Sequence, residues 1–220
     1  MVCLFVNATA RSSILILRNC SFLFSILLLI TGAWSQVQVR QKQQLDQWFL
    51  AANQAYANRD FSEAARLYRT SIKNGEQVVF SWFNLGNTLV QLNRNDPAMD
   101  AYRRTVELAP HFSRAWVQMG DLLFLSGSLA EAVAPYRRAL ELEVLDEVHV
   151  RHALAEIAIA LGEWTEAQFH LERTLTLEPD RVDLWFALTA THEGLKDWRA
   201  AESTLLQALE RAPSAGAAVW

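Results

Sequence analysis

Apolar residues recur at helical spacing over most of the chain, and most regularly in residues 81–110. One helix face there is formed at positions i, i+3, i+4 and i+7 by Trp82, Leu85, Gly86 and Leu89. The polar residues 93–95 break the pattern, and Asp96 followed by Pro97 is typical of the cap and first turn of a second helix. Pro110 ends that helix. The stretch therefore predicts a helical hairpin, which needs neighbours to bury its apolar stripe.

The same pattern predicts five consecutive pairs of helices along the chain. The predicted ranges are 45–58 and 61–74, 79–93 and 97–109, 113–126 and 129–143, 148–161 and 164–178, and 182–194 and 198–211. Asp60 with Glu63, and Ser128 with Glu131, match the capping-box pattern at the start of a helix. Asp197 is expected to cap the last helix. The chain is therefore expected to be all-α.

The pairs form an internal repeat with a period near 34 residues. A first-helix position recurs at spacings of 34, 34, 35 and 34 as Trp48, Trp82, Trp116, Arg151 and Trp185. The second helices repeat in step as Ala64, Ala98, Ala132, Ala167 and Ala201, each followed four residues later by Tyr68, Tyr102, Tyr136, Leu171 and Leu205. Three of the units close with Pro110, Pro179 and Pro213. With this period and these residue types, residues 46–213 resemble the tetratricopeptide repeat family. The resemblance implies a right-handed α-solenoid of about five helix-turn-helix units.

On this resemblance the units span 45–78, 79–112, 113–147, 148–181 and 182–213. They follow a leader at 1–35 and a polar linker at 36–44, and residues 214–220 are a tail or the start of a truncated sixth unit. Two departures stand out. Arg151 replaces the expected Trp, and the third unit lacks its closing Pro and gains one residue near 144–147. Both are expected to loosen the packing between the third and fourth units.

The leader combines an apolar core at 21–30 with the small residues Ala33 and Ser35. This pattern predicts a signal peptide that is cleaved after Ser35, with export to a bacterial periplasm or cell envelope. The alternative is that residues 1–35 stay attached as an N-terminal anchor in the inner membrane. In that case the membrane contact would be made through this segment alone.

Charge and cysteine content narrow the classes of partner. The formal net charge is −4, and because the leader holds Arg11 and Arg18 and no acid, the remainder has 18 basic against 24 acidic residues, a net of −6. This balance disfavours nucleic acid or an anionic membrane as the main partner. Cys3 and Cys20 both lie in the leader, so the mature chain would form no disulfide.

The resemblance also implies that the first helices line a concave groove. Mapped onto this chain, the candidate binding residues are Phe49, Asn53, Tyr56, Phe80, Phe83, Asn84, Asn87, Arg114, Gln118, Asp121, His152 and Glu156. Such a groove is aromatic and aliphatic with a polar ladder along it, which suits a peptide or helix with apolar anchors. The alternative is architectural: Asn84 and Asn87 are consensus residues of the repeat, and Phe83 packs against its neighbours.

Other candidate sites have weaker support. Asn53, Asn84 and Arg114 match positions of the family's carboxylate clamp, but Phe49 and Gln118 replace its other cations, and one cation holds two carboxylates poorly. His149, His152 and Glu156 share a helix face and could form a weak metal site or a pH-sensitive patch, although solvated groove histidines are the favoured interpretation. Neither a catalytic motif nor a nucleotide-binding loop is found, so the sequence predicts no enzyme, no metal site and no small-molecule cofactor.

The sequence thus predicts a non-catalytic scaffold or adaptor that binds a protein or peptide in its groove. Two alternatives stay open. The chain could be the interaction or regulatory region of a longer multidomain enzyme, because Trp220 falls where a sixth repeat would place its Trp. It could also be a structural array that self-associates through an uncapped C-terminal end.

Overall fold

The computed structural model describes residues 46–211, and all regular structure in that range is α-helical. The helices are α2 (Gln47–Ala57), α3 (Phe61–Lys73), α4 (Val78–Gln91), α5 (Asn95–Leu108), α6 (Ser113–Leu125), α7 (Leu129–Glu141), α8 (Glu147–Leu161), α9 (Trp164–Leu177), α10 (Val182–Gly194) and α11 (Trp198–Arg211). The ten predicted helices are all present, and no end differs from its prediction by more than two residues.

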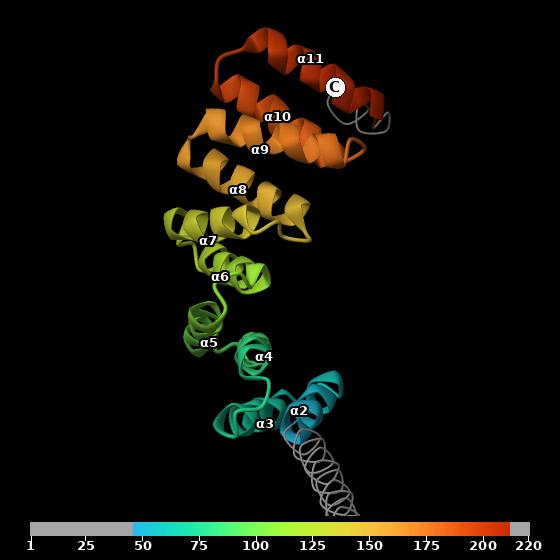
Figure 1. Cartoon of the computed structure of the whole chain (residues 1–220). Helices are drawn as coiled ribbons and strands as arrows, with labels where there is room; N and C mark the ends of the chain where they lie inside the picture. Colours follow the sequence, from blue (N-terminus) through green and yellow to red (C-terminus); the bar gives the residue numbers. More distant parts are fainter. Residues whose placement is uncertain (1–45, 212–220) are drawn as a thin grey trace, which may run out of the picture.

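The helices stack in chain order into an elongated array (Figure 1). Each even-numbered helix packs on the odd-numbered helix that follows it, and each odd-numbered helix packs on the first helix of the next pair. Contacts are thus made between neighbours in sequence, as in a repeat solenoid. The predicted all-α solenoid of helix-turn-helix units is confirmed.

Small residues on the first helices let the two helices of a pair approach closely. A Cβ added at Gly86 would lie less than 3.0 Å from three ring atoms of Tyr102, and one added at Gly120 equally close to Tyr136. Both tyrosine rings are fully buried. The alanine that begins the buried face of each second helix is also buried, from Ala64 to Ala201. The repeating columns therefore form the core.

The turn inside each pair contains one residue in the left-handed conformation, at the same register of the repeat. These residues are Arg59, Asn93, Gly127, Gly162 and Lys196, with φ between 56° and 80°. Two of the predicted caps are confirmed: the carboxylate of Asp60 accepts the Glu63 N–H at 3.1 Å, and that of Asp197 accepts the Ala200 N–H at 3.0 Å. The left-handed residue reverses the chain direction, and the cap starts the next helix.

Two cap predictions are wrong. Helix α5 begins at Asn95, so Asp96 lies inside its first turn rather than capping it. The side chain of Ser128 makes no capping hydrogen bond, because the Glu131 N–H bonds to the Ser128 carbonyl instead. The N-cap position directly follows the left-handed residue, so Arg94 holds it and Asp96 comes two residues too late, whereas Ser128 does hold it but without a side-chain bond.

The junction between the third and fourth units departs from the others as expected. The contact between α7 and α8 is the least extensive of those between successive units. Trp116 and Trp185 each donate an indole N–H to the carbonyl of the proline six residues earlier, at 3.1 and 2.8 Å. Arg151, at the equivalent position, instead pairs with Glu147 at 2.5 Å and lies over the Phe169 ring.

No helix within residues 46–211 is long and apolar enough to cross a membrane. The predictions of a leader, a cleavage site after Ser35 and a C-terminal tail fall outside the described residues.

Candidate functional site

The even-numbered helices present a continuous row of side chains, which we call the first-helix face. Two hydrogen bonds tie its members together across neighbouring pairs. The Asn84 amide donates to the Asn53 side-chain oxygen at 3.3 Å, and His149 Nε2 lies 2.8 Å from an Asp121 carboxylate oxygen. Helices α6 and α8 also contact each other directly, past the intervening α7. The Asn53–Asn84 and Asp121–His149 pairs therefore lie close together across neighbouring first helices.

The polar ladder along this face consists of Asn53, Asn87, Asp121 and Glu156. Three of these side chains already accept hydrogen bonds from other parts of the protein. In three successive units a buried tyrosine hydroxyl of the second helix donates to the ladder residue 15 positions earlier. The pairs are Tyr68 to Asn53 at 2.6 Å, Tyr102 to Asn87 at 2.8 Å, and Tyr136 to Asp121 at 2.7 Å. Burial raises the pKa of Tyr68 to about 12 and also raises the pKa of Tyr102 and Tyr136. A buried hydroxyl requires such a partner, so the ladder has a structural role.

These bonds fix the orientation of the ladder side chains. The Asn53 oxygen accepts from both Tyr68 and Asn84, and the Asn87 oxygen accepts from Tyr102. Each asparagine also carries an NH₂ group with two donors. The tyrosines thus hold the amide oxygens inward, which leaves the NH₂ groups of the ladder to serve as donors.

Aromatic rings cluster between α4 and α6. Phe83 is only 8% exposed and packs against Phe112, with ring centroids 5.0 Å apart. Phe80 is 44% exposed and meets Phe112 edge-on at 5.7 Å. The Arg114 guanidinium lies over the Phe83 and Phe112 rings, at 5.5 and 5.4 Å from their centroids. This cluster, Phe80–Phe83–Phe112–Arg114, offers an apolar surface topped by a cation.

The remaining aromatic candidates sit at the start of the array. Phe49 is half-buried and tilts against Tyr68, and Tyr56 packs edge-on against Phe61 at 5.4 Å. Phe112 was not among the predicted residues. The signal for it is its place before α6, where it packs on Phe83.

A pocket of about 340 Å³ opens between α6 and α8. It is lined by Asp121, Phe124, Leu125, Tyr136, His149, His152, Ala153 and Glu156. Gln118 donates to the second Asp121 oxygen at 3.0 Å, so both oxygens of this carboxylate are hydrogen-bonded. The bond to Asp121 raises the pKa of His149. This pocket collects four predicted residues: Gln118 supports it, and Asp121, His152 and Glu156 line it.

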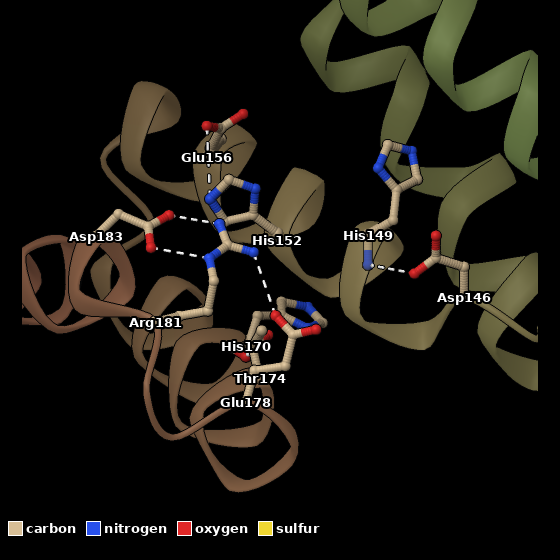
Figure 2. A network of polar contacts seen from close by, with 9 residues as sticks. All are labelled: Asp146, His149, His152, Glu156, His170, Thr174, Glu178, Arg181 and Asp183. Atoms are coloured by element: carbon tan, nitrogen blue, oxygen red, sulfur yellow. Dashed lines mark hydrogen bonds and ion pairs between the residues drawn. The ribbon is translucent and has the colours of Figure 1, made fainter.

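The two groove histidines have different partners. His149 bonds to Asp121, whereas His152 Nε2 lies 3.7 Å from the Glu156 carboxylate, as Figure 2 shows for the second pair. Within residues 46–211, no group of three or more histidine, cysteine, aspartate or glutamate side chains is placed to hold a metal ion. The alternative of a weak metal site at His149, His152 and Glu156 thus gains no geometric support.

The rest of the network in Figure 2 is structural. Arg181 pairs with Asp183 and, at 3.3 Å, with Glu178, which ties the turn before α10 to the end of α9. Burial lowers the pKa of His170, whose ring nitrogen lies 3.3 Å from the Glu166 carboxylate on the same helix.

One buried carboxylate was missed by the sequence reasoning. Glu76 is 3% exposed, and one of its oxygens accepts the backbone N–H groups of Trp48 and Phe49, at 3.0 and 3.1 Å. It therefore caps α2 from the loop that follows α3. Because the carboxylate is 27 and 28 residues away in sequence, no local capping pattern reveals it.

Comparison with known proteins places this architecture in a family. Models described as tetratricopeptide repeat match residues 49–111, 83–143 and 158–220. The chain belongs to the tetratricopeptide repeat family. No curated protein matches the chain in a sequence search.

Several solved structures share the fold of this tetratricopeptide repeat protein. A crystal structure of MamA superposes with a TM-score of 0.68 at 19% identity, covering 80% of this chain and 96% of that one. MamA 41-end from Desulfovibrio magneticus RS-1 gives 0.66 at 12% identity, covering 77% and 96%. YrrB, described as a TPR protein with an unusual peptide-binding site, gives 0.66 at 16% identity, covering 76% and 86%. At these identities the likeness establishes the fold.

Proposed function

We propose that the protein is a non-catalytic scaffold whose first-helix face binds a peptide or an extended segment of another protein. The observation that carries this proposal is that the exposed Phe80 and Arg114, packed on Phe112 and the buried Phe83, lie beside a ladder of oriented asparagines. Membership of the tetratricopeptide repeat family supports it, as does the peptide-binding site named for YrrB.

The geometry indicates how such a segment would be held. The NH₂ groups of Asn53 and Asn87 would donate to its backbone carbonyls, because their oxygens are already used by tyrosines. An apolar anchor would cover Phe80, and a carboxylate of the segment would meet Arg114, which is exposed. Backbone bonds would supply general affinity, and the side-chain contacts would supply selectivity.

The test is selection from a random peptide library on the full chain, followed by affinity measurements with the selected peptides. The double variant Phe80→Ala with Arg114→Ala should weaken binding by roughly tenfold or more. Arg104→Ala is the matched control, because this arginine lies on α5 and pairs only with Glu107 within the described residues. If no peptide is selected, or if the control loses as much affinity as the double variant, the proposal fails.

We propose in addition that the protein works in the cell envelope. The apolar core and the Ala33–Ser35 pattern of the leader support this proposal. Fractionation of cells that express the full chain, with N-terminal sequencing of the product, tests it. A cytosolic, full-length product would contradict it.

A second candidate function is self-association through α11. Trp198 and Leu206 on this helix are 66% and 56% exposed. Light scattering over a concentration series tests it, with Leu206→Glu as the disrupting variant. A wild-type protein that stays monomeric throughout would exclude it.

A further inference from the structure

The pocket between α6 and α8 differs in chemistry from the rest of the first-helix face. Its walls are mainly apolar, from Phe124, Leu125, Ala153 and the ring of Tyr136. Its volume of about 340 Å³ is enough for one long side chain. Leu125 is 76% exposed at its edge. The pocket is therefore apolar and open to solvent at the edge formed by Leu125, where a ligand side chain could enter.

The two carboxylates of the pocket are not equivalent. Asp121 is fully engaged, because Tyr136, Gln118 and His149 all bond to it. His149 also offsets its charge, since the raised pKa favours the protonated ring. Glu156, in contrast, lies 3.7 Å from His152, beyond hydrogen-bond distance, and its side chain is 49% exposed. Among the pocket residues that the structure describes, Glu156 is therefore the carboxylate that accepts no hydrogen bond.

The repeat explains why this acceptor is available. Glu156 occupies the ladder position held by Asn53, Asn87 and Asp121 in the earlier units. In those units the tyrosine of the second helix uses the ladder side chain. The fourth unit has Leu171 at the tyrosine position, and a leucine has no hydroxyl to donate. Glu156 is thus an acidic ladder residue without a tyrosine partner, and it lines the pocket.

We infer that this pocket receives one lysine or arginine side chain of the bound peptide, with its cationic head at Glu156 and its aliphatic stem along Phe124 and Leu125. Lysine and arginine combine an apolar stem with a charged head, which matches the order of groups in the pocket. A neutral aromatic side chain would cover the half-exposed Glu156 carboxylate without offering it a charge or a hydrogen bond, and an acidic one would be repelled. The inference rests on the proposed peptide-binding function and specifies one determinant of its selectivity.

The test uses the same random library, selected in parallel on the full-length wild-type chain and on Glu156→Gln, which keeps the shape and removes the charge. Wild-type selections should be enriched in lysine or arginine at one position, and Glu156→Gln selections should lose this enrichment. A selected peptide is then remade with norleucine in place of its basic residue. Either change alone, Glu156→Gln in the protein or norleucine in the peptide, should weaken binding by about threefold to tenfold. Both changes together should weaken binding no more than either one alone.

Two further variants sharpen the result. Glu156→Lys should shift the selected residue to aspartate or glutamate, and Glu172→Gln is a matched control, because its partner Gln168 lies on the same helix α9. If peptides are selected but show no basic position, or if the two changes act independently, the inference is overturned while the peptide-binding function stands. If no peptide is selected by any form of the chain, the proposed function itself fails.

Discussion

The hydrogen bonds between the tyrosine column and the ladder give a quantitative prediction within one protein. Tyr68→Phe, Tyr102→Phe and Tyr136→Phe each remove a hydroxyl and keep the buried ring, so the packing is preserved. The three bonds have nearly equal lengths, from 2.6 to 2.8 Å. Their acceptors differ, because two are neutral amides and the third is a carboxylate. The series therefore compares one charged acceptor with two neutral ones.

The magnitudes follow from these acceptors. A hydrogen bond between neutral groups contributes about 1 kcal/mol to the free energy of unfolding, and one to a charged group about 1.5–3 kcal/mol. Tyr68→Phe should cost least, because the Asn53 oxygen keeps the bond from Asn84. Tyr102→Phe should cost about 1 kcal/mol. Tyr136→Phe should cost about 2 kcal/mol, near the low end of the charged range, since Asp121 keeps two other donors.

The assay is urea unfolding at neutral pH, with circular dichroism and tryptophan fluorescence as two probes of the same transition. If the array opens locally rather than as a whole, hydrogen exchange of the α6 and α7 amides measures the local loss of stability instead. The predicted order of destabilisation is Tyr136→Phe, then Tyr102→Phe, then Tyr68→Phe. A Tyr136→Phe loss equal to or smaller than that of Tyr102→Phe would refute the charged-acceptor argument.

Three more predictions test other parts of the structure. Gly86→Ala should lower the free energy of unfolding by about 1 kcal/mol, because a clash with the buried Tyr102 ring costs more than the helix gains from Ala; an unchanged urea midpoint would contradict this. Glu76→Gln should cost about 1 kcal/mol and speed hydrogen exchange in α2, because the charge at the helix start is lost; exchange in α2 as slow as in the wild type would count against it. His149 should titrate above its usual pKa in NMR, so its contribution to stability is present below pH 6.5 and is lost as the pH rises through the folded-state pKa. Asp121→Asn should return the His149 pKa toward its usual value, and no change would show that another group raises it.

Much of the fold could be predicted because the repeat is local and recurs every 34 or 35 residues. Positions such as Trp82, Gly86 and Ala98 report packing that recurs in most of the units, so an error in one unit is corrected by the others. The capping residues were predicted less accurately than the bounds of the helices. Asp96 lies two residues beyond the N-cap position, which Arg94 holds, and Ser128 holds the N-cap position of its helix but its side chain makes no capping bond.

The site was predicted less completely, for a physical reason. The assignment of a binding face stays a prediction, and the sequence did not show which ladder residues are hydrogen-bonded inside the protein. The bond from Tyr102 to Asn87 and the bonds that Glu76 accepts from the start of α2 depend on how one segment is placed against another. A constant separation of 15 residues between ladder and tyrosine was visible in the sequence, and it is the signal that could have revealed the first of these. Glu156 differs from the other ladder residues because the fourth unit has Leu171, which has no hydroxyl, at the tyrosine position.

The central claim is that ligands bind on the first-helix face. It is tested most directly by hydrogen exchange of the full chain with and without a library-selected peptide at saturating concentration. Binding on this face should slow exchange in α4, α6 and α8 and leave the exposed sides of α5, α7 and α9 unchanged. Protection confined to α5, α7 and α9 would contradict the account.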